Sequence, residues 1–282
     1  MNPKNIYCPP YEYLYIYYIQ GVVKASSEKQ LFLENYIGNW IEEDTSFLFF
    51  ACSSLDRIDA LLALQPELKL LDQFQMKYEE WCGGQFEVIS ISDIIIAPPW
   101  MHRISEIDKH PLWLDPGVVF GAGTHPTTYD CLNAIDRAFS ILPIQTMIDI
   151  GTGTGLLSLF CARKGANKIL ALDLNPLAVQ TAQNNIRINN LDSKILPVQG
   201  DANKLMCAPV DLWVANIHYD VLRPMVQSED FFKNKMFIIS GLLYSQSLKI
   251  RSILDNLPVK IIQTWEGTWF TCLGQSENIQ NE

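Results

Sequence analysis

Alternating glycines follow an apolar segment near the middle of the chain, in the run Asp149–Gly155, which reads DIGTGTG. Because glycine has no Cβ, a ligand can lie directly against the backbone of such a turn, and we expect Gly151 and Gly153 to contact it. A dinucleotide fingerprint needs a further glycine three residues after the second one, where this chain has Leu156. The run therefore favours an adenosyl ligand without a pyrophosphate over NAD. A purely structural strand-to-helix turn is the alternative.

An acid ends the next apolar segment, because Asp173 follows Ala171-Leu172 and lies 22 residues after Gly151. A carboxylate at the carboxyl end of a strand can accept hydrogen bonds from both hydroxyls of a ribose. The following Asn175 and Pro176 have the pattern of an N-cap and a first helical proline, so we assign Asp173 and not Asn175 to the ligand. Asp201, after Gly200, is a weaker second candidate near the adenine, since loop acids are commonly only solvated.

An amide side chain, Asn216, ends the apolar segment that begins at Asp211. It is expected at the same edge of the sheet as Gly151 and Asp173, where open α/β sheets bind ligands. An amide oxygen and neighbouring backbone carbonyls can accept hydrogen bonds from an amine and aim its nitrogen lone pair at an electrophilic methyl group. Asn216 is therefore the candidate catalytic residue. The alternative is that it caps the following helix.

A segment rich in glycine and threonine, Asp115–Thr128, lies upstream of these motifs. Its backbone and its hydroxyl groups, such as those of Thr124 and Thr128, can close over a ligand. His125 could act as a general base. No carboxylate lies at a suitable spacing from it, so we favour a structural or substrate-lining role. No His, Asp or Glu cluster has metal-ligand spacing, and no metal is expected.

Strands and helices alternate regularly from Pro143 onward and would position these residues. The helices are expected to begin at Gly155, Pro176 and Ser245. Seven strands are expected, at Thr146–Ile150, Lys168–Leu172, Ile195–Gln199, Asp211–Ala215, Met236–Ser240, Lys260–Trp265 and Thr268–Leu273. Strands separated by helices indicate a parallel, doubly wound α/β sheet, and the last two, with no helix between them, indicate an antiparallel hairpin.

The first third of the chain has the pattern of a small α+β unit. It contains an expected strand at Tyr11–Ile19, a helix from a Ser27 capping box to about Trp40, a strand at Ser46–Cys52 and a helix at Leu55–Leu64. No glycine-rich turn accompanies these elements, which favours a binding module. We expect a recognition domain at residues 1–75, a connector at 76–115 with a helix at Tyr78–Trp81 and strands within Phe86–Ile96, and a catalytic domain at 116–282.

Composition limits the class of protein. Hydrophobic residues make up 48% of the 282 residues and charged residues 18%, which is typical of a globular protein. The formal charge of −10 disfavours direct nucleic-acid binding and favours a cationic partner. The seven cysteines are scattered and contain no Cys-x-x-Cys pair, so neither a zinc site nor a disulfide framework is indicated. No leader and no membrane span are expected, which favours a soluble, cytoplasmic protein.

The segment Asp115–Thr128 resembles the loop of PrmA-type methyltransferases, which modify ribosomal protein eleven of the large subunit. That loop typically reads FGTGTHPTT, and here only Ala122 departs from it, in place of threonine. The motifs at Asp149–Gly155, Asp173–Pro176, Val214–Ile217 and Ser240–Leu243 follow in the family's order, so the resemblance extends from about Tyr78 to the C terminus.

The resemblance implies a seven-stranded, Rossmann-like class I methyltransferase fold with S-adenosylmethionine as methyl donor. It implies methylation of amino groups, lysine side chains or the N-terminal amine, on a ribosomal protein. It further implies cofactor contacts at Thr128, Gly151, Asp173 and Asn216 and a small ferredoxin-like N-terminal domain that holds the protein substrate. A monomer is expected.

One departure from the family lies after Asn216-Ile217, where His218-Tyr219-Asp220 replace small residues. Asp220 could attract a lysine ammonium and Tyr219 could pack against its methylene stem, unless both residues open the next helix and face away. The departure leaves room for another protein substrate, such as the electron-transfer flavoprotein beta subunit. An NAD-dependent oxidoreductase and a non-catalytic S-adenosylmethionine-binding protein are the alternatives from other classes.

Overall fold

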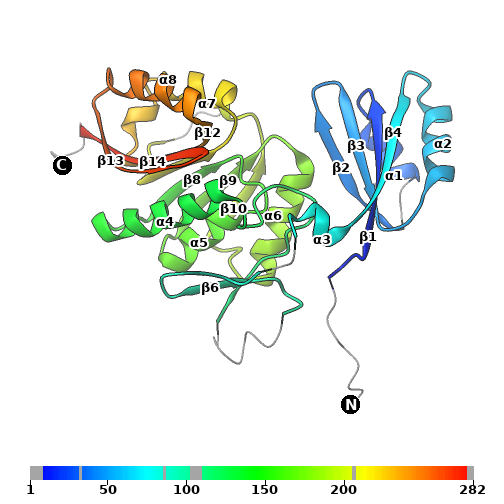
Figure 1. The fold of residues 1–282 in the computed structure, drawn as a ribbon, viewed down its shortest axis with the longest axis horizontal. Helices are drawn as coiled ribbons and strands as arrows, with labels where there is room; N and C mark the ends of the chain where they lie inside the picture. Colours follow the sequence, from blue (N-terminus) through cyan, green and yellow to red (C-terminus); the bar gives the residue numbers. More distant parts are fainter. Residues whose placement is uncertain (1–8, 32–33, 85–86, 102–109, 205–207, 278–282) are drawn as a thin grey trace, which may run out of the picture. The chain divides into compact units, whose positions relative to one another are not determined.

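The computed structural model describes residues 9–31, 34–84, 87–101, 110–204 and 208–277 and divides the chain into two compact units (Figure 1). One unit spans Met1–Phe86 with Trp100–His102, and the other spans Glu87–Pro99 with Arg103–Glu282. The domain boundary expected at residue 75 falls inside strand β4 (Lys69–Lys77). Two of the seven cysteines, Cys8 and Cys207, and Phe86, the first residue of the expected connector strands, lie outside the described residues.

A seven-stranded sheet forms the centre of the second unit and confirms the expected doubly wound α/β fold. Its order is β10 (Ile195–Gln199), β9 (Lys168–Asp173), β8 (Thr146–Ile150), β11 (Leu212–Asn216), β12 (Met236–Leu243), β14 (Trp269–Ser276) and β13 (Val259–Glu266). The first five strands are parallel, and β14 runs antiparallel to both of its neighbours. The chain reverses direction across the sheet between β8 and β11, which creates the switch point where such sheets bind ligands.

Helices cover both faces of this sheet (Figure 1). They are α4 (Pro126–Ile141), α5 (Leu156–Lys164), α6 (Pro176–Ile188), α7 (Tyr219–Val226) and α8 (Tyr244–Leu254). Met147 of β8 belongs to a core cluster with side chains of α4, α5 and α6, whereas Ile148 and Ile150 belong to a cluster with side chains of α7 and α8. Burial on both faces explains why the strands are apolar at consecutive positions.

Short elements complete the second unit. Single turns of 3-10 helix occur at η2 (Ala202–Lys204) and η3 (Phe231–Lys233). A small sheet of β5 (Ile89–Ile91), β6 (Ile94–Ala97) and β7 (Leu112–Trp113) precedes the loop that leads into α4.

The first unit is a four-stranded antiparallel sheet with two helices. Its elements are β1 (Tyr13–Gln20), α1 (Ala25–Leu31), β2 (Tyr36–Glu42), β3 (Thr45–Phe50), α2 (Leu55–Leu64) and β4, followed by the short α3 (Tyr78–Trp81). The strands lie in the order β2-β3-β1-β4. The β-α-β-β-α-β succession is that of ferredoxin-like domains.

The helix predicted from Ser27 to about Trp40 is wrong in its second half. Helix α1 ends at Leu31, and the residues from Tyr36 onward form β2, which pairs with β3. Asn35 has a positive φ of 59°, a conformation that helices do not continue through. Ser27 also does not cap the helix, because it lies inside α1. Strand β4 was not predicted.

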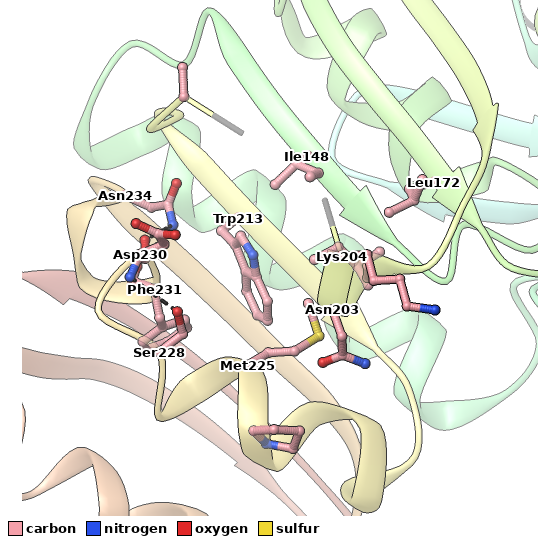
Figure 2. A pocket seen from close by; sticks show the side chains of 14 residues that line it. Ile148, Leu172, Asn203, Lys204, Trp213, Met225, Ser228, Asp230, Phe231 and Asn234 are labelled. Atoms are coloured by element: carbon pink, nitrogen blue, oxygen red, sulfur yellow. Dashed lines mark hydrogen bonds between the residues drawn. The ribbon is translucent and has the colours of Figure 1, made fainter. Parts of the chain in front are cut away.

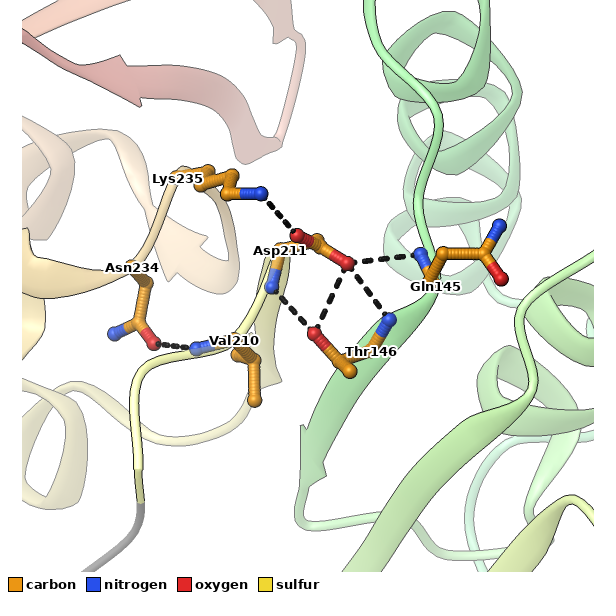
Figure 3. Close-up of polar contacts among 6 residues, drawn as sticks. All are labelled: Gln145, Thr146, Val210, Asp211, Asn234 and Lys235. Carbon is orange, nitrogen blue, oxygen red and sulfur yellow. Dashed lines mark hydrogen bonds and ion pairs between the residues drawn. The ribbon is translucent and has the colours of Figure 1, made fainter. Parts of the chain in front are cut away.

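A carboxylate joins the amino ends of three parallel strands (Figure 3). Oδ2 of Asp211 accepts hydrogen bonds from the backbone amides of Gln145 and Thr146, both at 2.9 Å, and from the Thr146 hydroxyl at 3.0 Å. Its Oδ1 lies 2.7 Å from Nζ of Lys235, next to β12. These contacts fix the register of β8, β11 and β12, and thus the relative heights of their carboxyl ends.

Candidate functional site

The glycine turn after β8 requires glycines for steric reasons. Gly151 and Gly153 have positive φ angles of 70° and 54°. A Cβ on Gly151 would lie 2.3 Å from Cγ2 of Ile217, and one on Gly153 would lie 2.3 Å from the carbonyl oxygen of Phe120. The turn therefore brings three segments together, and side chains at these positions would force them apart.

Asp173 lies at the end of β9, beside this turn. Its Oδ2 accepts a hydrogen bond from the amide of Gly153 at 3.0 Å, and its Oδ1 accepts one from the amide of Asn175 at 2.9 Å. Burial raises the pKa of Asp173 above its ordinary value, although the amides of Asn175 and Gly153 oppose this shift. Each carboxylate oxygen has two lone pairs, so both oxygens retain capacity for the hydroxyl groups of a ribose.

The other polar residues near β9 and β10 have local roles. Asn175 caps α6, because its Oδ1 accepts a hydrogen bond from the amide of Leu177 at 3.0 Å. Asp201 accepts one from the amide of Asn203 at 3.0 Å and pairs with Lys204 at 3.2 Å. The carboxylate of Asp201 is thus used within its own loop.

In the described part of the second unit, two buried side-chain oxygen atoms have no hydrogen-bond partner: Oδ1 of Asp149 and Oγ1 of Thr128. Burial raises the pKa of Asp149 to about 6. The hydrogen bonds that its Oδ2 accepts from the hydroxyls of Thr152 and Ser158, both at 2.7 Å, oppose this shift. An unsatisfied buried acceptor costs about 1–3 kcal/mol, so such atoms suit a ligand with N–H groups, such as the ammonium of S-adenosylmethionine. The residues at this edge therefore fit that cofactor. Asp149 was not predicted as a site residue, although an acid inside an apolar strand was a visible signal.

The loop before α4 is held against the glycine turn. The amide of Thr154 donates to the carbonyl of Phe120 at 3.1 Å, and its hydroxyl donates to the carbonyl of Gly121 at 2.7 Å. From α6, Asn185 exchanges two hydrogen bonds of 2.8 Å with the backbone of Asp115. Thr124 is exposed and takes no part in these contacts, so its predicted cofactor role stays a prediction.

A chain of hydrogen bonds joins this loop to Asn216 at the end of β11. Nδ2 of Asn216 lies 3.2 Å from Oγ1 of Thr127, and that oxygen lies 2.8 Å from Nδ1 of His125. His125 caps α4, since Nδ1 accepts a hydrogen bond from the amide of Thr127 at 3.3 Å. The favoured structural role of His125 is consistent with this geometry, and Thr127 was missed by sequence reasoning.

Gly241 in β12 is adjacent to the Asn216 side chain. A Cβ on Gly241 would lie 2.8 Å from the carbonyl oxygen of Ile217 and 3.1 Å from Oδ1 of Asn216. The two oxygens, both acceptors, therefore lie close together beside the glycine, and the backbone nitrogen of Ile217 lies 3.1 Å from the same position.

The residues after Ile217 open helix α7. Tyr219 is buried in the core with Leu222 and Ile250, so the expectation that it packs against a lysine stem at the entrance is wrong. Asp220, in the first turn of α7, is exposed.

A cavity of about 410 Å³ lies on the α7 face of the sheet (Figure 2). Apolar side chains such as Ile148, Leu172 and Trp213 form its wall, and Asn203 and Lys204 lie at its rim. Gly151, Asp173 and Asn216 are not among the lining residues, so the cavity is separate from the site at the strand ends.

Two further findings concern the residue ranges that the structure describes. Within those ranges, no group of three or more His, Cys, Asp or Glu side chains could hold a metal ion. The same ranges contain no helix with the length and apolar character needed to cross a membrane.

A family model, curated relatives and a solved structure point to the same family. The family described as "Ribosomal protein L11 methyltransferase (PrmA)" matches residues 47–277. A relative of that name from Exiguobacterium sibiricum is 29% identical over 233 residues, which cover 76% of this chain and 73% of the relative. One from Bacillus cereus is 34% identical over 188 residues, covering 64% of this chain and 60% of the relative. The crystal structure of a ribosomal protein L11 methylase from Lactobacillus delbrueckii is similar, with a TM-score of 0.60, 27% identity and coverage of 68% of this chain and 100% of that one.

Proposed function

The chain belongs to the ribosomal protein L11 methyltransferase family, and we propose that it transfers methyl groups from S-adenosylmethionine to amino groups of ribosomal protein L11. One observation carries the proposal: a single sheet edge holds the glycine turn at Gly151, the carboxylate of Asp173 and the amide of Asn216. The fold is that of a class I methyltransferase, and S-adenosylmethionine is the methyl donor of this enzyme class.

The cofactor supplies a methyl group that is already electrophilic, because it is bonded to a sulfonium. Asp173 would hold the ribose hydroxyls, and the buried oxygens of Asp149 and Thr128 would accept hydrogen bonds from the ammonium group. Gly151 and Gly153 leave the backbone accessible.

The acceptor amine must be neutral when it reacts. Removal of a lysine from water disfavours its charged form and lowers its pKa from about 10.4, so the proton leaves to solvent before transfer. Oδ1 of Asn216 and the carbonyl of Ile217 would accept the N–H groups and aim the lone pair. The new nitrogen–carbon bond forms as the sulfur–carbon bond breaks, and no side chain needs to form a covalent intermediate.

Recognition of the protein substrate is the proposed role of the first unit. The helices cover one face of its sheet, which carries Tyr17 and Leu48, whereas Trp40, Phe47 and Tyr18 lie in one cross-strand row on the other face. The rings of Tyr18 and Phe47 are stacked, with centroids 4.6 Å apart. Aromatic side chains are enriched in protein interfaces.

The charge of this unit supports a basic partner. Residues 1–86 contain six Lys and Arg against twelve Asp and Glu, so more than half of the net charge of −10 lies here. Asp72 is exposed next to Tyr18, on β4. Complementary charge speeds association and selects partners. We therefore propose a basic ribosomal protein as the partner, with no direct binding to nucleic acid or to a membrane. We also propose that the protein is a monomer and is located in the cytoplasm.

The proposed activity is tested by incubating the protein with labelled S-adenosylmethionine and purified ribosomal protein L11. We expect label in L11 and masses raised by whole methyl groups at lysine or the N-terminal amine. Asp173→Ala is the matched control and should lose the label at low cofactor concentration. Label in another protein of the same extract and none in L11 would contradict the substrate, and no label in any protein would contradict the activity.

The role of the first unit is tested by Tyr18→Ala and Phe47→Ala. Loss of about 1.4 kcal/mol of binding energy would raise the KM for L11 about tenfold and leave the affinity for S-adenosylmethionine unchanged. Leu64→Ala is the control, since Leu64 is 46% exposed on α2, which covers the opposite face of the sheet. Equal effects of all three variants on KM would contradict docking of L11 on the sheet face that carries Trp40, Phe47 and Tyr18.

A further inference from the structure

We infer that Thr127 is a positioning residue for methyl transfer: its hydroxyl, held by Nδ1 of His125, orients the Asn216 amide with its oxygen toward the acceptor amine. The inference rests on the proposed transfer to an amine. Thr127 is 1% exposed and acts through Asn216, without itself needing to touch either substrate.

The direction of each hydrogen bond follows from the chemistry of the groups. Nδ1 of His125 accepts the amide N–H of Thr127, so this nitrogen carries no proton. In this tautomer the hydroxyl of Thr127, 2.8 Å away, donates its proton to Nδ1 and shares the lone pair of that nitrogen with the amide. Its lone pairs are left to accept, and at 3.2 Å they accept the N–H of the Asn216 amide.

The opposite orientation of the amide is disfavoured. If Asn216 were rotated by half a turn about its last bond, its oxygen would face the lone pairs of the Thr127 hydroxyl. Two acceptors without a proton between them repel, and one hydrogen bond worth about 0.5–1.5 kcal/mol would be lost. The network thus selects one orientation of a side chain whose two ends differ only in N and O.

The selected orientation places the oxygen where an acceptor is useful. Oδ1 of Asn216 and the carbonyl oxygen of Ile217 lie together beside Gly241. With the amide reversed, an N–H donor would replace one of these two acceptors. An incoming amine would then meet a donor where it needs an acceptor, and its lone pair would be used for a hydrogen bond instead of attack.

The imidazole of His125, the first group in this hydrogen-bond network, is itself held in place. The ring of His125 contacts those of Phe120 and Trp269 edge-on, with centroids 5.2 and 5.3 Å away. Burial also lowers the pKa of His125, which favours the neutral ring that can accept at Nδ1. Trp269 begins β14 and pairs with Leu243, near the carboxyl end of β12, so the network joins three segments of the unit.

The test compares Thr127→Val, which keeps the shape but removes the hydroxyl, with Thr127→Ser, which keeps the hydroxyl. We expect Thr127→Val to lower kcat at least tenfold with little change in the affinity for S-adenosylmethionine, and Thr127→Ser to retain most of the parental kcat. In an Asn216→Ala background, Thr127→Val should have no further effect, because the two residues act as one unit. Parental kcat in Thr127→Val, equal losses in both Thr127 variants, or additive losses in the double variant would overturn the inference.

A second measurement does not depend on activity. The side-chain amide signals of Asn216, recorded by NMR in the complete protein, should shift in Thr127→Val and keep their parental positions in Thr127→Ser. Unchanged signals in Thr127→Val would overturn the inference. A parental protein that methylates no amine would instead contradict the proposed function, while the NMR result would still decide whether Thr127 orients Asn216.

Discussion

The two edges of the seven-stranded sheet both carry aspartates, but they use them differently. At the amino edge, Asp211 is saturated by two backbone amides, a hydroxyl and an ammonium (Figure 3). At the carboxyl edge, Asp149 leaves one oxygen without a partner, and the hydrogen bonds to Asp173 come from backbone amides such as those of Gly153 and Asn175.

The pKa shifts follow the same division. Burial acts to raise the pKa of Asp211, but Lys235 and the hydrogen bonds from Gln145 and Thr146 outweigh it and hold the pKa below its ordinary value. At the other edge burial prevails, and the pKa values of Asp149 and Asp173 are raised. A carboxylate with a full set of hydrogen-bond and ion-pair partners within the protein stabilises the fold. Carboxylates that lack some of these partners mark the edge where a ligand can supply the missing hydrogen bonds.

Removal of an under-satisfied carboxylate should affect binding most. Asp173→Ala should weaken S-adenosylmethionine binding about tenfold to a hundredfold or more, since charge-assisted hydrogen bonds contribute roughly 1.5–3 kcal/mol. Calorimetric titration measures this, with Asp201→Ala as the control that should bind almost normally. Unchanged affinity in a folded Asp173→Ala variant would remove this residue from the site.

Removal of the saturated carboxylate should instead affect stability. Asp211→Asn should lower the free energy of unfolding by about 1–2 kcal/mol, since Lys235 is half-exposed and its pairing is partly screened by solvent. Kinetic constants should be unchanged. The folded-state pKa of Asp211 is lowered. The difference in unfolding free energy between the parental protein and Asp211→Asn should therefore be complete above about pH 4, the ordinary pKa of a carboxyl group, and should vanish as the pH falls through the folded-state pKa. If Asp211→Asn lost cofactor binding without losing stability, the purely structural role assigned to the amino edge would be contradicted.

The buried acid of the carboxyl edge should show the opposite pH dependence. The pKa of Asp149 is raised to about 6, so the folded state binds its proton more tightly than the unfolded chain does. The stability of the parental protein relative to Asp149→Asn should therefore be highest below about pH 4 and fall as the pH rises to about 6. Denaturant unfolding between pH 4 and 7 measures this difference. A constant or rising difference would show that Asp149 is better solvated or better paired than the structure indicates.

The smallest expected effect concerns Asp220, an exposed acid beyond the carboxyl edge. Asp220→Ala should raise the KM for the protein substrate about two- to fivefold at low salt and less at physiological ionic strength, since exposed ion pairs contribute little and are screened. Steady-state kinetics over a salt series would detect it. Equal KM values at every salt concentration would assign Asp220 only to the first turn of α7.

Much of the parallel sheet was predictable from local patterns. Apolar segments of five or six residues, each followed by Gly, Asp or Asn and a helix start, indicated β8, β9 and β11 within one residue at each end. The antiparallel first unit was less predictable. Strand β2 was predicted as helix because its pairing partner β3, and not its own sequence, determines its conformation, and β4 lacks alternation because most of its side chains are exposed.

The sequence by itself determined the residue types at the site: glycines where a Cβ would collide, Asp173 at a strand end, and Asn216 next to a helix start. These depend on local chain geometry, which neighbouring residues specify. Only the tertiary structure decided which polar atoms are satisfied. Thr127 meets Asn216 across 89 residues because α4 packs against β11, and Asp149 lacks a partner for one oxygen inside the packed unit. Hydrogen-bond partners distant in the sequence follow from the packing of the whole unit, so no local pattern contains them.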